Sequence, residues 1–322
     1  MKKLVILGST GSLGTQTLEV LQKHRKEFEV IGLAAGQNTR LLNKQAKSLN
    51  CKGISKKDGS AALLKMAAHP EADIVINIIS GLAGIKPTFS ALKAGKTLIL
   101  GNKESVVAEG QQIKKYLSQI IPLDSEHNAI YEILKAHPNE KIDYITLPCS
   151  GGPLYGKSSQ EIVNALTSDL TKHPKWSMGP KITLESATLI NKGLEIIEAH
   201  YLFKLPFSRI RTKIHPACRI HGMVTFATGE TYAYFGQPDM REHIKNCLLG
   251  VNPASIKKIN PKTQELYEVP HKNLPGIKIV LQAYRNGRIK EFLKKEERIM
   301  KNPPSTFAQL LICLRSKKEN AK

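Results

Sequence analysis

The sequence is poor in the residues that mark several protein classes. Only five cysteines occur in 322 residues, they are scattered, and none forms a C-x-x-C pair. This pattern argues against a disulfide framework and a structural zinc site, and it favours a reducing cytoplasm. No apolar run approaches the roughly 20 residues of a membrane span. The short apolar run at the N-terminus passes directly into a glycine turn, so we expect a buried first strand there and no signal peptide.

Acidic residues are also scarce, because 27 of them face 48 lysines and arginines, which leaves a net charge of +21. Such an excess would serve nucleic-acid binding, attract phosphorylated small molecules, or reflect a lysine-rich solvated surface. The basic residues are spread along the chain without a nucleic-acid recognition motif. We therefore expect neither a nucleic-acid partner nor a membrane partner. The length predicts two or three domains.

Glycine turns follow several short apolar runs in the first half. Residues 3–7 form an apolar run, residues 8–14 space their glycines as G-x-x-G-x-x-G, and an amphipathic stretch follows. This order of strand, glycine turn and helix is typical of a dinucleotide-binding site. Further apolar runs at 73–79 and 97–100 also precede glycines, which predicts parallel strands covered on both faces.

The type of dinucleotide is indicated by the end of the next apolar run, at 29–35. An NAD site would carry an acidic residue there, to bind the ribose hydroxyl. The sequence instead continues Gly36-Gln37-Asn38-Thr39-Arg40. We predict NADP, since no carboxylate repels a 2′-phosphate and Arg40 is near enough in sequence to meet one.

Two carboxylates, Asp124 and Glu126, follow the apolar step at 120–122. On an extended segment, which we expect here, side chains two residues apart point to the same face. Carboxylates held so close repel, share a proton or bind a hard cation. The alternative is an acidic surface turn. A third carboxylate, Glu195, lies within one helical turn of Asn191 and Lys192 in a predicted helix, and together these groups suit a metal and an anionic substrate.

The second half of the chain shows a different pattern of predicted elements, which includes a β-hairpin. Residues 142–147 and 220–224 suggest strands, and 231–235 form the return strand of a hairpin. We predict an α/β protein with an N-terminal Rossmann-like, doubly wound parallel sheet, a central α+β catalytic domain and a C-terminal helical domain, which is shortened in comparison with the family whose resemblance is described below. The expected boundaries are 1–122 for NADPH binding, 123–249 for metal and substrate, 250–276 for a proline-rich linker and 277–322 for the helical domain.

Seven segments of the chain resemble the 1-deoxy-D-xylulose 5-phosphate reductoisomerase family in sequence and in order. They are residues 8–14, 101–105, 122–130, 150–153, 173–179, 186–195 and 236–241. The resemblance implies NADPH- and divalent-metal-dependent rearrangement and reduction of 1-deoxy-D-xylulose 5-phosphate to 2-C-methyl-D-erythritol 4-phosphate, in non-mevalonate isoprenoid biosynthesis. It also implies a homodimer and either Mg²⁺ or Mn²⁺ as the cation.

The resemblance also implies roles for individual residues. The metal ligands would be Asp124, Glu126 and Glu195, and the catalytic residues would be these three with Lys103 and His173. The substrate would be bound by Lys103, Ser125, Glu126, Ser150, His173, Trp176, Ser186, Asn191, Lys192 and Glu195, with Trp176 on a covering loop. NADPH would be bound by Thr10, Gly11, Ser12, Leu13, Gly36, Gln37, Asn38, Asn102, Glu104 and Gly179.

Some positions depart from the family pattern. Gln37 replaces a usual lysine or arginine, Glu185 replaces an aspartate, and residues 215–222 are altered around His221. A C-terminal Asn-Ala-Ala-Asn-Glu stretch is absent. Two alternatives therefore stay open: an NADP-dependent oxidoreductase acting on another sugar phosphate, and a degenerate, non-catalytic family member.

Overall fold

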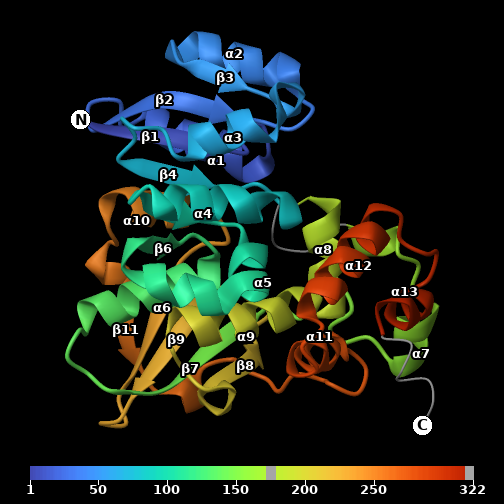
Figure 1. Ribbon diagram of the computed structural model, residues 1–322. Helices are drawn as coiled ribbons and strands as arrows, with labels where there is room; N and C mark the ends of the chain where they lie inside the picture. The colour runs from blue at the N-terminus through green and yellow to red at the C-terminus, as the bar shows by residue number, and fades with distance from the viewer. Residues whose placement is uncertain (172–178, 316–322) are drawn as a thin grey trace. The chain divides into compact units, whose positions relative to one another are not determined.

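The computed structural model describes residues 1–171 and 179–315 (Figure 1). The chain divides into two compact units, Met1–Tyr131 with Asp239–Asn252, and Glu132–Pro238 with Pro253–Lys322. The first unit therefore contains a segment from far along the chain, which our predicted boundaries at 122 and 249 did not include. Among the described residues, no helix combines the length and the apolar character that crossing a membrane requires.

The first unit is built on a six-stranded sheet in the order β3-β2-β1-β4-β5-β6, and every neighbouring pair is parallel. Its strands are β1 (Lys2–Leu7), β2 (Phe28–Ala34), β3 (Lys52–Ile54), β4 (Ile74–Asn77), β5 (Thr97–Leu100) and β6 (Ile120–Pro122). This is the doubly wound order in which dinucleotides bind beyond the carboxyl ends of the strands. The predicted Rossmann-like sheet is confirmed.

Helices connect these strands and help to bury their apolar side chains, among them Leu4, Ile6 and Ile99. The helices are α1 (Ser12–Gln22), α2 (Thr39–Leu49), α3 (Gly59–Ala67), α4 (Ile85–Lys93), α5 (Lys103–Ile113), α10 (Met240–Leu249) and α6 (Ser125–Ala136), which continues into the second unit. In Figure 1, α10 appears in orange among the blue and cyan elements of this unit. Its Ile244 and Cys247 join the same apolar core, so the returning segment is an integral part of the unit.

The second unit holds a mixed sheet in the order β11-β10-β9-β7-β8. Its strands are β7 (Ile142–Cys149), β8 (Ile210–Ile214), β9 (Ile220–Phe226), β10 (Thr231–Phe235) and β11 (Ile256–Ile259). The predicted hairpin is confirmed, because β9 and β10 pair antiparallel. The prediction of a linker over 250–276 was wrong for β11, which pairs with β10. Pro253 and Pro261 flank this edge strand without interrupting its hydrogen bonds.

Helices make up the rest of the second unit. They are α7 (Ser159–Asn164), α8 (Pro180–Thr188), α9 (Ile190–Leu202), α11 (Gly276–Arg285), α12 (Ile289–Lys301) and α13 (Phe307–Leu314). The C-terminal helical region is confirmed, and α11 and α12 are separate helices within it. Gly287, with φ +68°, lies in the break between them. A Cβ on Gly193 would lie 2.8 Å from Cβ of Val280, so this glycine lets α9 and α11 pack closely.

Candidate active site

The glycine-rich turn after β1 is shaped by two close approaches. Gly8 has φ +102°, and a Cβ there would lie 2.8 Å from the carbonyl oxygen of Ile78. A Cβ on Gly14 would lie 2.3 Å from the carbonyl oxygen of Gly8. These two glycines therefore let the turn pack against α1 and against the end of β4. Gly11 caps α1 without a side-chain hydrogen bond, and a helix N-terminus of this kind suits a pyrophosphate.

The segment after β2 exposes Gly36, Gln37 and Asn38 to solvent. The side chain of Asn38 caps α2, accepting a hydrogen bond from the backbone N–H of Leu41 at 3.2 Å. Arg40 is also exposed and lies in the first turn of α2. The surface presented beyond this strand is therefore neutral to basic, as an NADP phosphate requires.

Asn102 and Glu104, beyond β5, brace the loop that follows β4. The amide nitrogen of Asn102 donates to the carbonyl oxygens of Ile79 and Gly81, at 2.7 and 2.8 Å. Glu104 accepts from the backbone N–H of Gly81 at 3.0 Å. Asn102 is completely buried. These two side chains shape the loop at the carboxyl end of the sheet, and the predicted cofactor residues of the first unit follow the strands β1, β2 and β5 at this end.

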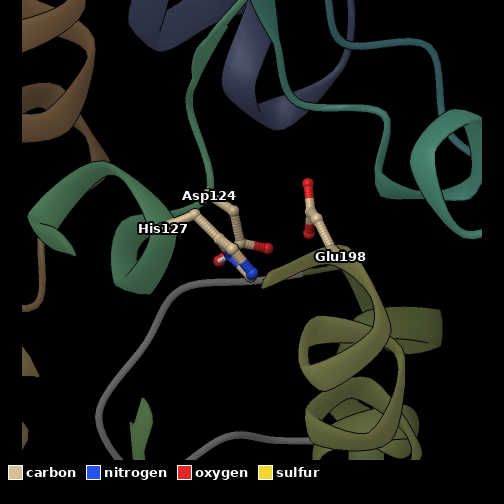
Figure 2. Close-up of side chains that lie close together, drawn as sticks. All are labelled: Asp124, His127 and Glu198. Atoms are coloured by element: carbon tan, nitrogen blue, oxygen red, sulfur yellow. Dashed lines mark ion pairs between the residues drawn. The ribbon is translucent and has the colours of Figure 1, made fainter. Parts of the chain in front are cut away.

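Asp124 lies between β6 and α6, and its carboxylate is paired with a lysine. Nζ of Lys103 is 2.6 Å from Oδ2 of Asp124, and Nδ1 of His127 is 3.8 Å from Oδ1. Burial opposes ionisation, but the Lys103 ammonium and the neighbouring His127 imidazole outweigh it and hold the pKa of Asp124 well below its usual value. Figure 2 shows Asp124 with His127, which was not among our predicted site residues.

The prediction of an extended segment carrying Asp124 and Glu126 was wrong. The backbone N–H of Asn128 donates to the carbonyl oxygen of Asp124 at 2.7 Å, which is the first hydrogen bond of α6. Glu126 therefore lies in the first turn of a helix, where the helix dipole favours a carboxylate. The hydroxyl of Ser125 donates to Oε2 of Glu126 at 2.5 Å.

In the second unit, the small-residue loop after β7 packs on α8. Gly151 and Gly152 have φ values of +84° and +68°, and a Cβ on Gly152 would lie 3.0 Å from Cα of Ala187. Gly152 also donates its backbone N–H to the hydroxyl of Ser150 at 3.0 Å. Ala187 follows Ser186 directly in sequence. The contact between Gly152 and Ala187 therefore places the loop that carries Ser150 next to the turn that carries Ser186, and these are the two predicted phosphate-binding serines.

A break between α8 and α9 positions the remaining predicted residues. Leu189 has φ +60°, in the left-handed region that a leucine rarely adopts, and α9 begins at the next residue. Ser186 therefore lies in the last turn of α8, and Asn191, Lys192 and Glu195 lie near the start of α9, the helix that we had predicted for them.

The start of α9 carries a buried ion pair. Lys192 and Glu195 are 3% and 1% exposed and form a salt bridge. Asn191 also donates its amide to Glu195. Nζ of Lys192 donates to the carbonyl oxygen of Pro148 at 2.7 Å, which ties α9 to β7. Glu198, one turn further along α9 and 1% exposed, is drawn in Figure 2. Because Glu198 follows Glu195 by three residues, both carboxylates lie on the same face of α9, and this spacing is visible in the sequence.

The remaining positions that the sequence analysis singled out lie outside the clusters described above. His173 and Trp176 lie outside the described residues. Gly179 caps the start of α8 with an extended backbone and is exposed. His221 is 3% exposed, and its Nε2 lies 3.1 Å from the carbonyl oxygen of Gln237. His221, the second histidine of the altered segment 215–222, is therefore held by a hydrogen bond to a backbone carbonyl oxygen.

Two family models match this chain, and both describe the same enzyme family. The family model for 1-deoxy-D-xylulose 5-phosphate reductoisomerase matches residues 4–62 and 52–110, and the model for its C-terminal domain matches 120–203. The reductoisomerase of Halothermothrix orenii is 38% identical over 317 residues, which cover 89% of this chain and 82% of the relative. That of Thermodesulfovibrio yellowstonii is 40% identical over 316 residues, with coverage of 89% and 82%.

This chain belongs to the 1-deoxy-D-xylulose 5-phosphate reductoisomerase family. Solved structures agree. A reductoisomerase in complex with NADPH, fosmidomycin and magnesium matches with a TM-score of 0.83 and 27% identity, covering 99% of this chain and 90% of that one. The enzyme from Zymomonas mobilis in complex with NADPH matches with a TM-score of 0.76 and 25% identity, with coverage of 97% and 96%. Membership confirms the predicted fold and the predicted oxidoreductase activity.

Proposed function

We propose that Asp124 and Glu126 of the first unit and Glu195 of the second bind one divalent cation during the reduction of 1-deoxy-D-xylulose 5-phosphate by NADPH. The observation that carries this proposal is the Lys103–Asp124 ion pair, in which Nζ lies 2.6 Å from Oδ2. In keeping with this pair, the pKa of Asp124 is held well below the usual value, despite burial, by Lys103 and His127. Glu195 is likewise buried beside an ammonium, that of Lys192. Asp124 and Glu195 are therefore each paired with a lysine of their own unit.

The donor set fits a hard cation. Three carboxylates offer only oxygen ligands, which Mg²⁺ and Mn²⁺ prefer. A second set, Asp124 with His127 and Glu198, includes an imidazole nitrogen, which Mg²⁺ accepts poorly. We therefore favour the all-oxygen set. When bound, the cation supplies Lewis acidity and a template for the carbonyl and neighbouring hydroxyl oxygens of the substrate.

We assign the substrate phosphate to Ser150, Ser186, Asn191 and Lys192, which all belong to the second unit. The support is the close packing of Gly152 on Ala187 and the buried position of Lys192 at the start of α9. Hydroxyl and amide donors with one fixed cation suit a phosphate monoester. In this proposal, Lys103, Ser125 and Glu126 contact the sugar hydroxyls.

We assign NADPH to the carboxyl end of the parallel sheet. The turn at Thr10, Gly11, Ser12 and Leu13 offers a helix N-terminus to the pyrophosphate, and residues 36–38 lie beyond β2, where the ribose phosphate is read. Asn102 and Glu104 shape the neighbouring loop, and we include Gly179 because the family resemblance implies it.

We also propose a homodimer and a cytoplasmic location. All five cysteines are free, which suits a reducing compartment.

The deciding experiment incubates the purified protein with NADPH, Mn²⁺ and 1-deoxy-D-xylulose 5-phosphate and follows the absorbance of the reduced nicotinamide. We expect oxidation that requires all three, and a product that is identified as 2-C-methyl-D-erythritol 4-phosphate. Oxidation with a different sugar phosphate only would support the broader oxidoreductase alternative. No oxidation with any sugar phosphate, from protein that binds NADPH, would support a non-catalytic family member.

A further inference from the structure

The buried amide of Asn128 joins the turn before α6 to the returning helix α10. Its Nδ2 donates to the carbonyl oxygen of Pro122 at 3.2 Å and to Sγ of Cys247 at 3.3 Å. Its Oδ1 lies 3.1 Å from Nδ1 of His243 and 3.3 Å from Nδ2 of Asn246. Asn128 and His243 are completely buried. The side-chain amide thus uses both donors and both acceptor positions.

The contacts fix the orientation of this amide. A flipped amide would place its oxygen against the carbonyl oxygen of Pro122, and its nitrogen against the amide nitrogen of Asn246. Both contacts would be repulsive, so Oδ1 must face Asn246 and the ring of His243. Nδ1 of His243 therefore carries the proton that it donates to Asn128. The thiol of Cys247 donates in turn to the carbonyl oxygen of Pro122 at 3.5 Å.

The network holds both ends of the turn that carries Asp124. The side chain of Asn128 holds the carbonyl oxygen of Pro122, and its backbone N–H holds that of Asp124 at 2.7 Å. Leu123, between them, is completely buried. The position of the Asp124 backbone is therefore set by a polar network that reaches α10, a helix more than a hundred residues away in sequence.

We propose that Asn128 is a positioning residue, which works with His243 and Asn246 to fix the turn that bears Asp124 for cation binding. This inference depends on the proposed role of Asp124 as a metal ligand. A network of four hydrogen bonds around one fully buried amide is satisfied in one arrangement only, so it specifies geometry as well as adding stability. Losing one bond would let the turn shift and would move the carboxylate relative to Glu126.

The test measures Mn²⁺ binding to the metal-free protein by calorimetry, beside thermal unfolding and NADPH affinity. Asn128→Asp places a carboxylate oxygen against the carbonyl of Pro122, and Asn246→Ala removes one donor from outside the turn. We expect each to weaken Mn²⁺ binding about tenfold or more, as is usual when groups that orient metal ligands are lost. NADPH affinity should stay within about twofold of the unaltered protein.

Thr17→Val is the matched control, because Thr17 is also fully buried in the first unit and donates one hydrogen bond, to the carbonyl oxygen of Leu13 at 2.7 Å. It should lower the unfolding temperature and leave Mn²⁺ affinity unchanged. If Asn128→Asp does not fold, Asn246→Ala alone carries the test. Unfolding temperatures lowered as in the control, with unchanged Mn²⁺ affinity, would overturn the positioning role.

The outcome for Asp124→Asn separates this inference from the proposed metal site. If that variant binds Mn²⁺ normally, the metal assignment itself fails. If it loses Mn²⁺ while the variants at Asn128 and Asn246 keep it, the metal assignment stands and only the positioning role is wrong.

Discussion

Nζ of Lys103 lies 2.6 Å from Oδ2 of Asp124, and the two side chains are only 16% and 14% exposed. Lys103 begins α5, directly after the loop beyond β5, and Asp124 follows β6, the next strand of the sheet. Adjacent parallel strands end at the same edge, which is why residues 21 positions apart in sequence meet there. The ion pair keeps Asp124 charged, and a charged carboxylate is the form that binds a cation.

Removing the lysine charge should therefore impair the carboxylate. In Lys103→Met the pKa of Asp124 rises, because burial still opposes ionisation and the main opposing charge is gone. We expect kcat/KM to fall at least about 10²-fold and the acid limb of its pH profile to move to higher pH. Lys103→Arg, which keeps the charge, should shift that limb less. An acid limb unchanged in Lys103→Met would show that the pair does not set the ionisation of Asp124.

The Lys103–Asp124 pair also affects stability against acid. A carboxyl group whose pKa is depressed by folding adds stability that is present above its unfolded pKa, and is lost as the pH falls through the folded pKa. The unaltered protein should therefore retain this contribution through neutral and mildly acid conditions. Lys103→Met should lose it at a higher pH, which unfolding by urea at a series of pH values would reveal.

Glu195→Gln should abolish most turnover while NADPH still binds. The substitution removes the anionic charge from a proposed cation ligand that is 1% exposed, and it leaves Lys192 without its charged partner in α9. We expect a loss of at least about 10²-fold in kcat, because an interaction of this kind acts on the reacting atoms. NADPH affinity should be unchanged, as measured by quenching of protein fluorescence, because nine of the ten predicted NADPH residues belong to the first unit.

The control for Glu195→Gln is Glu268→Gln in the same unit. Glu268 also pairs with a lysine, Lys213, but it is 83% exposed, so its loss should leave turnover and stability nearly unchanged. Normal turnover in Glu195→Gln, with that control also normal, would count against the metal assignment.

Gln37→Lys should tighten NADPH binding. Gln37 is exposed just beyond β2, where a dinucleotide presents its ribose, and a lysine there would attract the 2′-phosphate. For an exposed ion pair we expect a gain of about threefold to tenfold, which declines with added salt. NADH affinity should not change. Gln112→Lys adds the same charge at an exposed position on α5 and serves as the control, and equal gains in both variants would indicate a general charge effect.

Three strands of the first sheet, β1, β4 and β5, were predictable because each is a compact apolar run that a glycine turn follows. β5 begins and ends where the sequence pattern placed it, at 97 and 100. The start of α6 was mispredicted because we extended the apolar step at 120–122 through Asp124. The acidic first turn after Pro122 is a helix-start signal that should have taken precedence.

Other features of the site depend on contacts that sequence spacing does not contain. The network at Asn128 requires α10 to return to the first unit, and the sequence gives no sign that residues 128 and 243 meet. The left-handed Leu189 that separates α8 from α9 is a residue type that normally avoids this conformation. It is compatible with the packing of Gly276, whose Cβ would lie 2.0 Å from the carbonyl oxygen of Thr188.

Glu132 on α6 provides a stability test with the opposite sign to that of Asp124. It is 2% exposed, and Nζ of Lys135 approaches only to 4.0 Å. Burial raises the pKa of Glu132, and Lys135 offsets this only in part. Since folding raises this pKa, stability is lost as the pH rises from the unfolded pKa through the folded one.

Glu132→Gln should therefore unfold at a higher temperature than the unaltered protein at neutral pH. The difference should shrink as the pH falls below the unfolded pKa of about 4.3, since the carboxyl then becomes protonated in both states. A variant less stable at neutral pH would mean that the carboxylate is better solvated or better paired than its surroundings indicate.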